Sequence, residues 1–227
     1  CRVASGTAVV FVDVTTQFAE GDAEMLTDGI VKIVQRAPPG RRIRIATITD
    51  SFSRMRILFD TCVPGCRADD GDCTELRNRR LIPEFDERLK HALADVVPRA
   101  SLPRTDIALT LAYALRSRNE DEGKLSVYAF SDMLERSRSL DLVAVAKRAA
   151  DRKANPVALR KEAVDTLKRV GFDLDLTGVP VIVFGFGRED SKRDPLDPET
   201  AQFVRVFWTD VFRSAGATRV DFHAVLP

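Results

Sequence analysis

A continuous apolar run at residues 8–14, AVVFVDV, constrains the fold of this chain more than any other feature. The run is rich in valine and carries an acid, Asp13, at its carboxyl end. A strand that is covered on both faces of a parallel sheet has this pattern, because neither of its sides meets water. The sequence therefore predicts an α/β fold with this strand near the centre of the sheet.

Helical and strand patterns alternate along the rest of the chain. Helical periodicity covers residues 22–35, 83–97, 106–116, 139–170 and 198–214, with a break at Asn155 and Pro156. Strand patterns cover residues 43–49, 55–60, 125–130, 179–184 and 219–225, the second as a short hairpin or edge strand. This alternation predicts one domain, residues 1–227, with a doubly wound, mostly parallel sheet of about six strands and helices on both faces. Residues 1–6 would form an N-terminal tether and residues 61–82 a loop insertion that contains cysteines.

The charge balance excludes one class of function. Lysine and arginine number 35 against 34 aspartates and glutamates, which gives a net charge of +1. A chain with so little net charge has no general field that would attract nucleic acid, so we expect no nucleic-acid partner. No apolar run approaches the roughly 18 residues that a helix needs to cross a bilayer. We therefore expect membrane contact only through a lipid on Cys1.

The first residue, Cys1, leaves two interpretations open. It is either the lipid-carrying first residue of a mature bacterial lipoprotein or the edge of a piece cut from a longer chain. The lipoprotein interpretation favours a periplasmic or membrane-anchored protein, and a cytoplasmic one stays open.

Three further cysteines, Cys62, Cys66 and Cys73, are spaced C-x3-C-x6-C in the expected loop insertion. An oxidising compartment favours one disulfide among them. A zinc site would need a fourth ligand and usually has closer cysteine pairs. We therefore favour a disulfide over zinc or free thiols and leave the pairing open.

Oxygen-bearing side chains follow two of the expected buried strands. Asp13 ends the first strand and is followed by Thr15, Asp132 ends another strand, and Thr105 precedes the helix between them. Ligands of doubly wound sheets collect at the carboxyl ends of the strands. Carboxylate and hydroxyl oxygens suit a hard divalent cation, Mg²⁺ or Mn²⁺. The ordinary alternative is that these residues cap turns and helices, with Thr105 as an N-cap.

This arrangement resembles the metal-ion-dependent adhesion site of von Willebrand factor A domains, whose pattern is D-x-S-x-S, then a threonine, then an aspartate. On that pattern Asp13, Thr15 and Gln17 match the first three positions, Thr105 the fourth and Asp132 the fifth. Gln17 departs from it, because a longer amide replaces the second serine and could ligate only through its carbonyl oxygen. The stretches SDMLERS, CVPG, VFGFGR and FWTDVF resemble more specifically a divergent bacterial group of von Willebrand A-like proteins. The resemblance covers most of the chain and implies the Rossmann-like von Willebrand A fold.

The resemblance also implies a function. In that family the cation leaves one position open, and an acidic residue of a partner protein completes its shell. We therefore expect a protein-binding module that is not an enzyme, with Mg²⁺ or Mn²⁺ as the bridge to a protein partner. The alternative is a metal-free structural subunit that uses another surface in a larger assembly. A metal-assisted hydrolase would need a general base near the cation, and the sequence offers no clear candidate beyond the two aspartates. The oligomeric state stays open.

Overall fold

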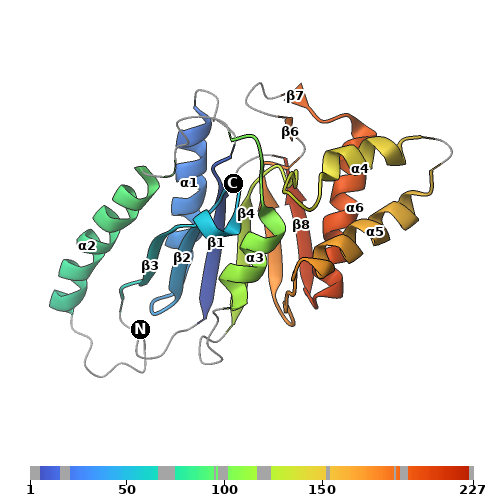
Figure 1. Ribbon diagram of the computed structural model, residues 1–227. Helices are drawn as coiled ribbons and strands as arrows, with labels where there is room; N and C mark the ends of the chain where they lie inside the picture. Colours follow the sequence, from blue (N-terminus) through green and yellow to red (C-terminus); the bar gives the residue numbers. More distant parts are fainter. Residues whose placement is uncertain are drawn as a thin grey trace.

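A computed structural model describes residues 6–15, 21–65, 75–94, 96, 102–116, 124–151, 154–186, 188–189 and 194–224. Its centre is a six-stranded sheet in the order β3-β2-β1-β4-β5-β8 (Figure 1). The strands are β1 (Thr7–Asp13), β2 (Arg42–Ile48), β3 (Ile57–Cys62), β4 (Leu125–Phe130), β5 (Pro180–Phe184) and β8 (Arg219–His223). Neighbouring strands pair in parallel, except that the edge strand β3 is antiparallel to β2. The predicted doubly wound α/β sheet, with the first strand at its centre, is therefore confirmed.

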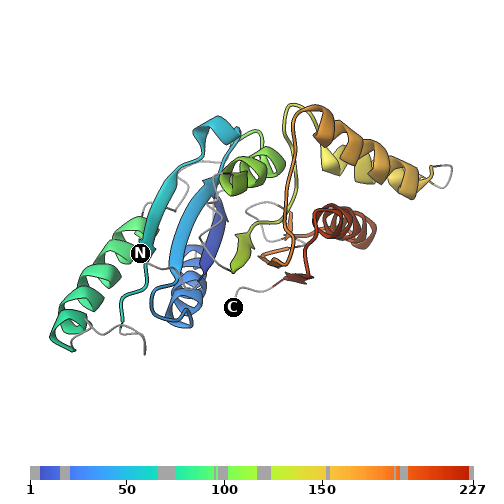
Figure 2. The same cartoon turned by 90° about the horizontal axis from the view of Figure 1, so that it is seen from below.

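Helices cover both faces of this sheet. They are α1 (Asp22–Gln35), α2 (Glu75–Ala94), α3 (Ile107–Arg116), α4 (Leu142–Ala149), α5 (Pro156–Arg169) and α6 (Pro198–Ser214), with a short 3-10 turn, η1 (Phe52–Arg54). The view along the sheet shows α1 on one face and α3 on the other (Figure 2). Two short strands, β6 (Arg188–Glu189) and β7 (Asp194–Pro195), form a separate antiparallel pair. Among the described residues, no helix has the length and apolar character needed to span a membrane.

The core explains why residues 8–12 of the first strand are all apolar. Ala8, Val10 and Val12 pack into the core that includes residues of α1 and α2. Val9 and Phe11 pack into the opposite core, with residues of α3, α4 and α6. All five side chains are at most 2% exposed. Since successive side chains of a strand point to opposite faces, the middle of a strand that is covered on both sides favours apolar residues at every position.

The helix α2 begins earlier than the sequence predicted. We expected a helix at residues 83–97 after a loop insertion at residues 61–82, but α2 spans Glu75–Ala94 and contains Pro83. Proline removes one backbone hydrogen bond and usually ends or begins a helix, which favoured the later start. Most of the residues before it, LRNRRLI, are good helix formers, and the helix continues through the proline. The expected insertion therefore includes the first turns of α2.

The break that the sequence predicted at Asn155 and Pro156 is confirmed, because it separates α4 from α5. Asn155 Oδ1 accepts hydrogen bonds from the backbone N–H of Val157 at 3.0 Å and of Ala158 at 3.2 Å. Pro156 is the first residue of α5. An asparagine N-cap followed by proline is a strong start signal, because proline needs no hydrogen-bond acceptor at that position.

The cysteines fall largely outside the described residues. Cys62, the last residue of β3, is disulfide-bonded. The structure does not describe the remaining cysteines, Cys1, Cys66 and Cys73, and so does not identify the partner of Cys62. Most of the expected tether also lies outside the described residues. The disulfide pairing and a lipid on Cys1 therefore stay predictions.

Candidate functional site

The register of β1 and β4 places Asp13 beside Ser131. Val12 pairs with Phe130 in parallel, so the next residue of each strand follows at the same level. Ser131 Oγ donates a hydrogen bond to Asp13 Oδ2 at 2.8 Å. Ser131 Oγ also accepts the backbone N–H of Met133 at 2.9 Å. These two contacts hold the loop after β4 against the end of β1.

The other oxygen of Asp13 accepts the hydroxyl of Thr15, which in turn contacts the hydroxyl of Thr105. Asp13 Oδ1 accepts hydrogen bonds from the backbone N–H of Thr15 at 3.0 Å and from Thr15 Oγ1 at 2.6 Å. Thr15 Oγ1 lies 2.7 Å from Thr105 Oγ1. Because Thr15 donates its proton to Asp13, Thr105 is the donor in the pair of hydroxyls. All three side chains are at most 8% exposed, so they form one buried chain of hydrogen bonds.

Thr105 does not cap the helix that follows it. The helix α3 begins two residues later, at Ile107. The backbone N–H groups of Ile107 and Ala108 donate to Glu135 Oε2, at 2.8 and 2.9 Å. The alternative role of Thr105 as an N-cap is therefore wrong, and its hydroxyl is directed to Thr15 instead.

A second carboxylate, Asp132, lies next to this group and is partly exposed. Its Oδ1 accepts the backbone N–H of Leu134 at 2.8 Å. Burial and the charge of Asp13 together raise the pKa of Asp132 from its ordinary 3.8 to about 7. Burial also raises the pKa of Asp13. Two neighbouring aspartates are costly to ionise together, and a cation between them would remove that cost.

The donor set fits a hard divalent cation. Asp13, Thr15, Thr105 and Asp132 offer carboxylate and hydroxyl oxygens, which Mg²⁺ and Mn²⁺ prefer, and these ions often keep several waters. Within the described part of the chain, no group of three or more His, Cys, Asp and Glu side chains could hold a metal. A cation here would therefore depend on the hydroxyls as well as on the two carboxylates. Gln17, the remaining expected ligand, lies outside the described residues.

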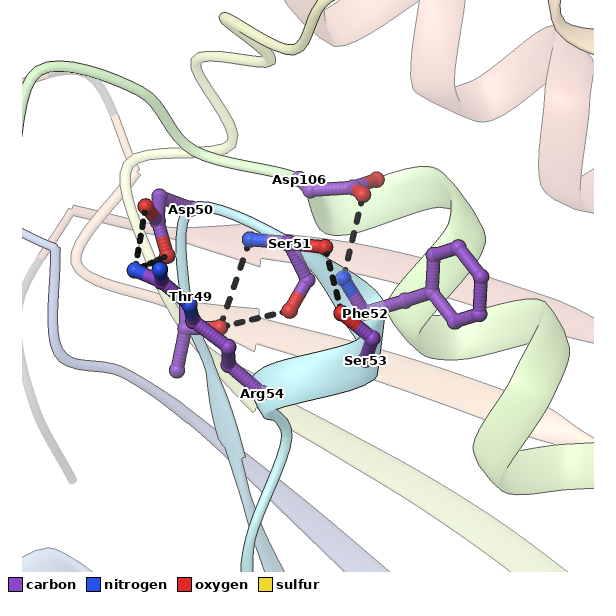
Figure 3. Close-up of polar contacts among 7 residues, drawn as sticks. All are labelled: Thr49, Asp50, Ser51, Phe52, Ser53, Arg54 and Asp106. Carbon is purple, nitrogen blue, oxygen red and sulfur yellow. Dashed lines mark hydrogen bonds and ion pairs between the residues drawn. The ribbon is translucent and has the colours of Figure 1, made fainter.

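The turn after β2 fixes the loop that carries Thr105 (Figure 3). The backbone N–H of Asp106 donates to the Thr49 carbonyl at 2.8 Å. Asp106 Oδ2 accepts the backbone N–H of Phe52 at 3.1 Å. Thr49 Oγ1 in turn donates to the carbonyl of Ser51 at 2.7 Å, which shapes the turn itself. Since Asp106 directly follows Thr105, these contacts restrict where the Thr105 hydroxyl can lie.

Ser131 and Glu135 take part in this arrangement although the sequence did not single them out as site residues. Both lie in the stretch SDMLERS, one of those that resemble a divergent bacterial group of von Willebrand A-like proteins. Their hydrogen-bond partners are far away in the chain, Asp13 for Ser131 and the start of α3 for Glu135. No local spacing connects such residues, so only the folded chain identifies them.

No protein-family model and no curated protein matches this sequence. Among solved structures, the chain is similar to the ArnB paralog VWA2 from Sulfolobus acidocaldarius, with 12% identity and a TM-score of 0.43. That match covers 97% of this chain and 41% of the other. Human COPII-coat protein Sec24c is similar with 10% identity and a TM-score of 0.45, over 98% of this chain and 30% of that one.

A von Willebrand factor type A structure from Catenulispora acidiphila has 13% identity and a TM-score of 0.33, over 94% of this chain and 43% of that one. Two of these three structures, VWA2 and this one, carry the von Willebrand factor A name. The chain spans less than half the length of each of these solved chains. At such identities and TM-scores the likeness says nothing of the site, which rests on the geometry described above.

Proposed function

We propose that this chain is a protein-binding module, and not an enzyme, that docks a partner at the carboxyl end of its sheet through a divalent cation. Asp13, Thr15, Thr105 and Asp132 would hold Mg²⁺ or Mn²⁺, with Gln17 as a further candidate ligand. An acidic residue of the partner protein would then complete the shell of the cation. The module would act by recruiting that partner, and the cation would supply the bridge.

One observation carries this proposal. The Thr15 hydroxyl donates to Asp13 Oδ1 and lies 2.7 Å from the Thr105 hydroxyl, beside a second aspartate whose pKa is raised to about 7. Four oxygen-bearing groups from three separate segments thus converge at the carboxyl end of the sheet, where ligands of such folds bind. A purely structural set of caps would not require two neighbouring acids, because each acid raises the cost of ionising the other.

A cation held by both hydroxyls and carboxylates is suited to bind an acidic side chain of a partner protein. Two carboxylates balance the charge of a divalent cation, and neutral hydroxyls add ligands without adding charge. A cation held in this way would still attract a carboxylate from a partner. Arg104 and Arg136, which are exposed in the two loops beside Thr105 and Asp132, would steer an acidic partner toward the same edge.

The metal-free scaffold is the second candidate, and one observation favours it. Both oxygens of Asp13 already accept hydrogen bonds from the protein, Oδ1 from Thr15 and Oδ2 from Ser131. A carboxylate that is satisfied in this way can persist without a cation. In that case the chain would bind its partners elsewhere, and the binding would not depend on divalent ions.

The proposal is tested by Mn²⁺ binding, followed through the loss of the electron paramagnetic resonance signal of free Mn²⁺. The variant Thr105→Val removes one ligand hydroxyl and keeps the shape of the side chain. Thr166→Val in α5 is the matched control, because its hydroxyl donates to the Glu162 carbonyl and accepts from Arg169, both within its own helix. We expect Mn²⁺ binding in the wild type and the control and a large loss in Thr105→Val. Equal binding in all three proteins would contradict the proposed site.

A lipid on Cys1 would place this docking module at a membrane surface. Lipoproteins carry more than one acyl chain, and a single chain gives only marginal membrane affinity. Metabolic labelling with a radioactive fatty acid, compared with a Cys1→Ser variant in the producing bacterium, tests this extension. Label that persists in the variant, or no label in the wild type, would contradict it.

A further inference from the structure

We propose that Glu135 is the positioning residue of the candidate cation site and sets the distance between the Thr105 loop and the Asp132 loop. This inference rests on the proposed function and deepens it, because it names the side chain that holds two of the ligands, Thr105 and Asp132, at a fixed distance from each other. Glu135 itself would not touch the cation.

The side chain of Glu135 is fixed at its outer end. It is fully buried, and its Oε2 accepts the backbone N–H groups of Ile107 and Ala108 at 2.8 and 2.9 Å. The first N–H groups of a helix have no partner within the helix, so a carboxylate placed there is held by hydrogen bonds and by the helix dipole. Because Ile107 comes two residues after Thr105, this contact ties Glu135 to the loop of one ligand.

The backbone around Glu135 joins the same two loops. Arg136 and Thr105 exchange backbone hydrogen bonds in both directions, at 3.2 and 3.0 Å. The carbonyl of Glu135 accepts the N–H of Leu142 at 2.9 Å, at the start of α4. The Glu135 side chain therefore connects its own backbone to the start of α3, and its length fixes the distance between them.

The loop between Glu135 and Asp132 has little freedom to absorb a shift. Met133 has a φ of 63°, a left-handed conformation that a methionine adopts only where its surroundings impose it. Its carbonyl accepts a hydrogen bond from Trp208 Nε1 at 2.8 Å, and both side chains are fully buried. A displacement at Glu135 would thus be passed on to Asp132, three residues away.

A simple capping role does not account for the placement of Glu135. The residue before α3 is Asp106, the type of side chain that usually caps a helix. Its Oδ2 accepts the N–H of Phe52, which ties the turn after β2 to the same loop (Figure 3). A glutamate from another loop nevertheless accepts the first two N–H groups of α3. The contact therefore connects α3 to the loop after β4, which a local cap would not do.

Two substitutions at this position separate length from charge. Burial raises the pKa of Glu135 to about 8. Glu135→Gln keeps the length and the accepting oxygen and removes the ionisable group, whereas Glu135→Asp keeps an ionisable group and shortens the side chain by roughly 1.5 Å. Asn155→Ala is the matched control, because Asn155 accepts two first-turn N–H groups of α5 in the same way, far from the site. Each protein is titrated with Mn²⁺, and its amide hydrogen exchange is measured without the ion.

We expect Glu135→Asp to weaken Mn²⁺ binding about tenfold or more, as loss of supporting contacts around a metal commonly does. Glu135→Gln and Asn155→Ala should bind within about threefold of the wild type if placement rather than charge is what matters. Wild-type affinity in Glu135→Asp, or an equal loss in both Glu135 variants, would overturn the inference. These results differ from a failure of the proposed function, in which the wild type itself binds no Mn²⁺.

Amide hydrogen exchange tests whether Glu135 positions the two loops, and it does so without a bound cation. In Glu135→Asp, faster exchange should reach the backbone N–H groups of Thr105, Leu134 and Arg136, which lie in the two loops. Faster exchange confined to Ile107 and Ala108 would show a local cap and overturn the inference.

Discussion

Replacing Asp132 with asparagine should stabilise the cation-free protein while it abolishes the proposed cation binding. The substitution keeps the size of the side chain, and its oxygen can still accept the N–H of Leu134, which now lies 2.8 Å from Oδ1. It removes one of the two neighbouring negative charges. A gain in stability together with a loss of binding is the signature of a site that is strained for function.

The structure sets the scale of this gain. The pKa of Asp132 rises from 3.8 to about 7, chiefly through burial and then through the charge of Asp13. At 1.36 kcal/mol per pKa unit, such a rise corresponds to a ceiling of roughly 4 kcal/mol. Because Asp132 is partly exposed, solvent screens a good part of this energy, and we expect a gain of about 1–2 kcal/mol at pH 8.

The dependence on pH has a definite sign. Since the pKa of Asp132 is higher in the folded than in the unfolded chain, the ionised form opposes folding. The penalty is complete above a pH of about 7, shrinks as the pH falls, and is gone below the ordinary value of 3.8. The advantage of Asp132→Asn should therefore be largest at pH 8 and fall to less than about half at pH 5.

Urea unfolding in the presence of a chelator, followed by circular dichroism at both pH values, measures this advantage. No gain at pH 8, or a gain that is the same at pH 5, would refute the reasoning. Added Mg²⁺ should stabilise the wild type by mass action and leave Asp132→Asn unchanged.

Three further substitutions, two beside the site and one far from it, are tested by urea unfolding. Trp208→Phe removes the hydrogen bond to the Met133 carbonyl and leaves a void, so it should cost about 2–3 kcal/mol, and a cost near zero would contradict that contact. Ser131→Ala leaves Asp13 Oδ2 without its hydroxyl donor and should cost about 1–2 kcal/mol, with an unchanged stability as the opposing result. Asn155→Ala should cost about 1 kcal/mol through the lost cap of α5 and leave the site untouched; a change in Mn²⁺ binding would count against its use as a control.

The central strand was predictable because its pattern is unambiguous. A run such as AVVFVDV has no polar position before its terminal acid, and only a strand covered on both faces requires that. The start of α2 was not predictable in the same way. Pro83 is a strong local signal for a helix boundary, and the helix nevertheless runs through it.

The candidate site was predictable in part, according to how far its contacts reach along the chain. Asp13 and Thr15 are two residues apart, and their contact follows from a local turn after a strand. Thr105 and Asp132 could be expected beside them only through the resemblance to a family pattern. Glu135 could not be expected at all, because its partners at the start of α3 are 27 and 28 residues away and no rule of spacing connects them.

The central claim, that a divalent cation binds among Asp13, Thr15, Thr105 and Asp132, is tested most directly by calorimetry. The purified chain is titrated with Mg²⁺ and Mn²⁺ beside the variant Asp13→Ala, whose fold is checked by circular dichroism. The account predicts binding to the wild type that disappears in the folded variant. An intact chain that binds neither ion, or a variant that binds as well as the wild type, would contradict it.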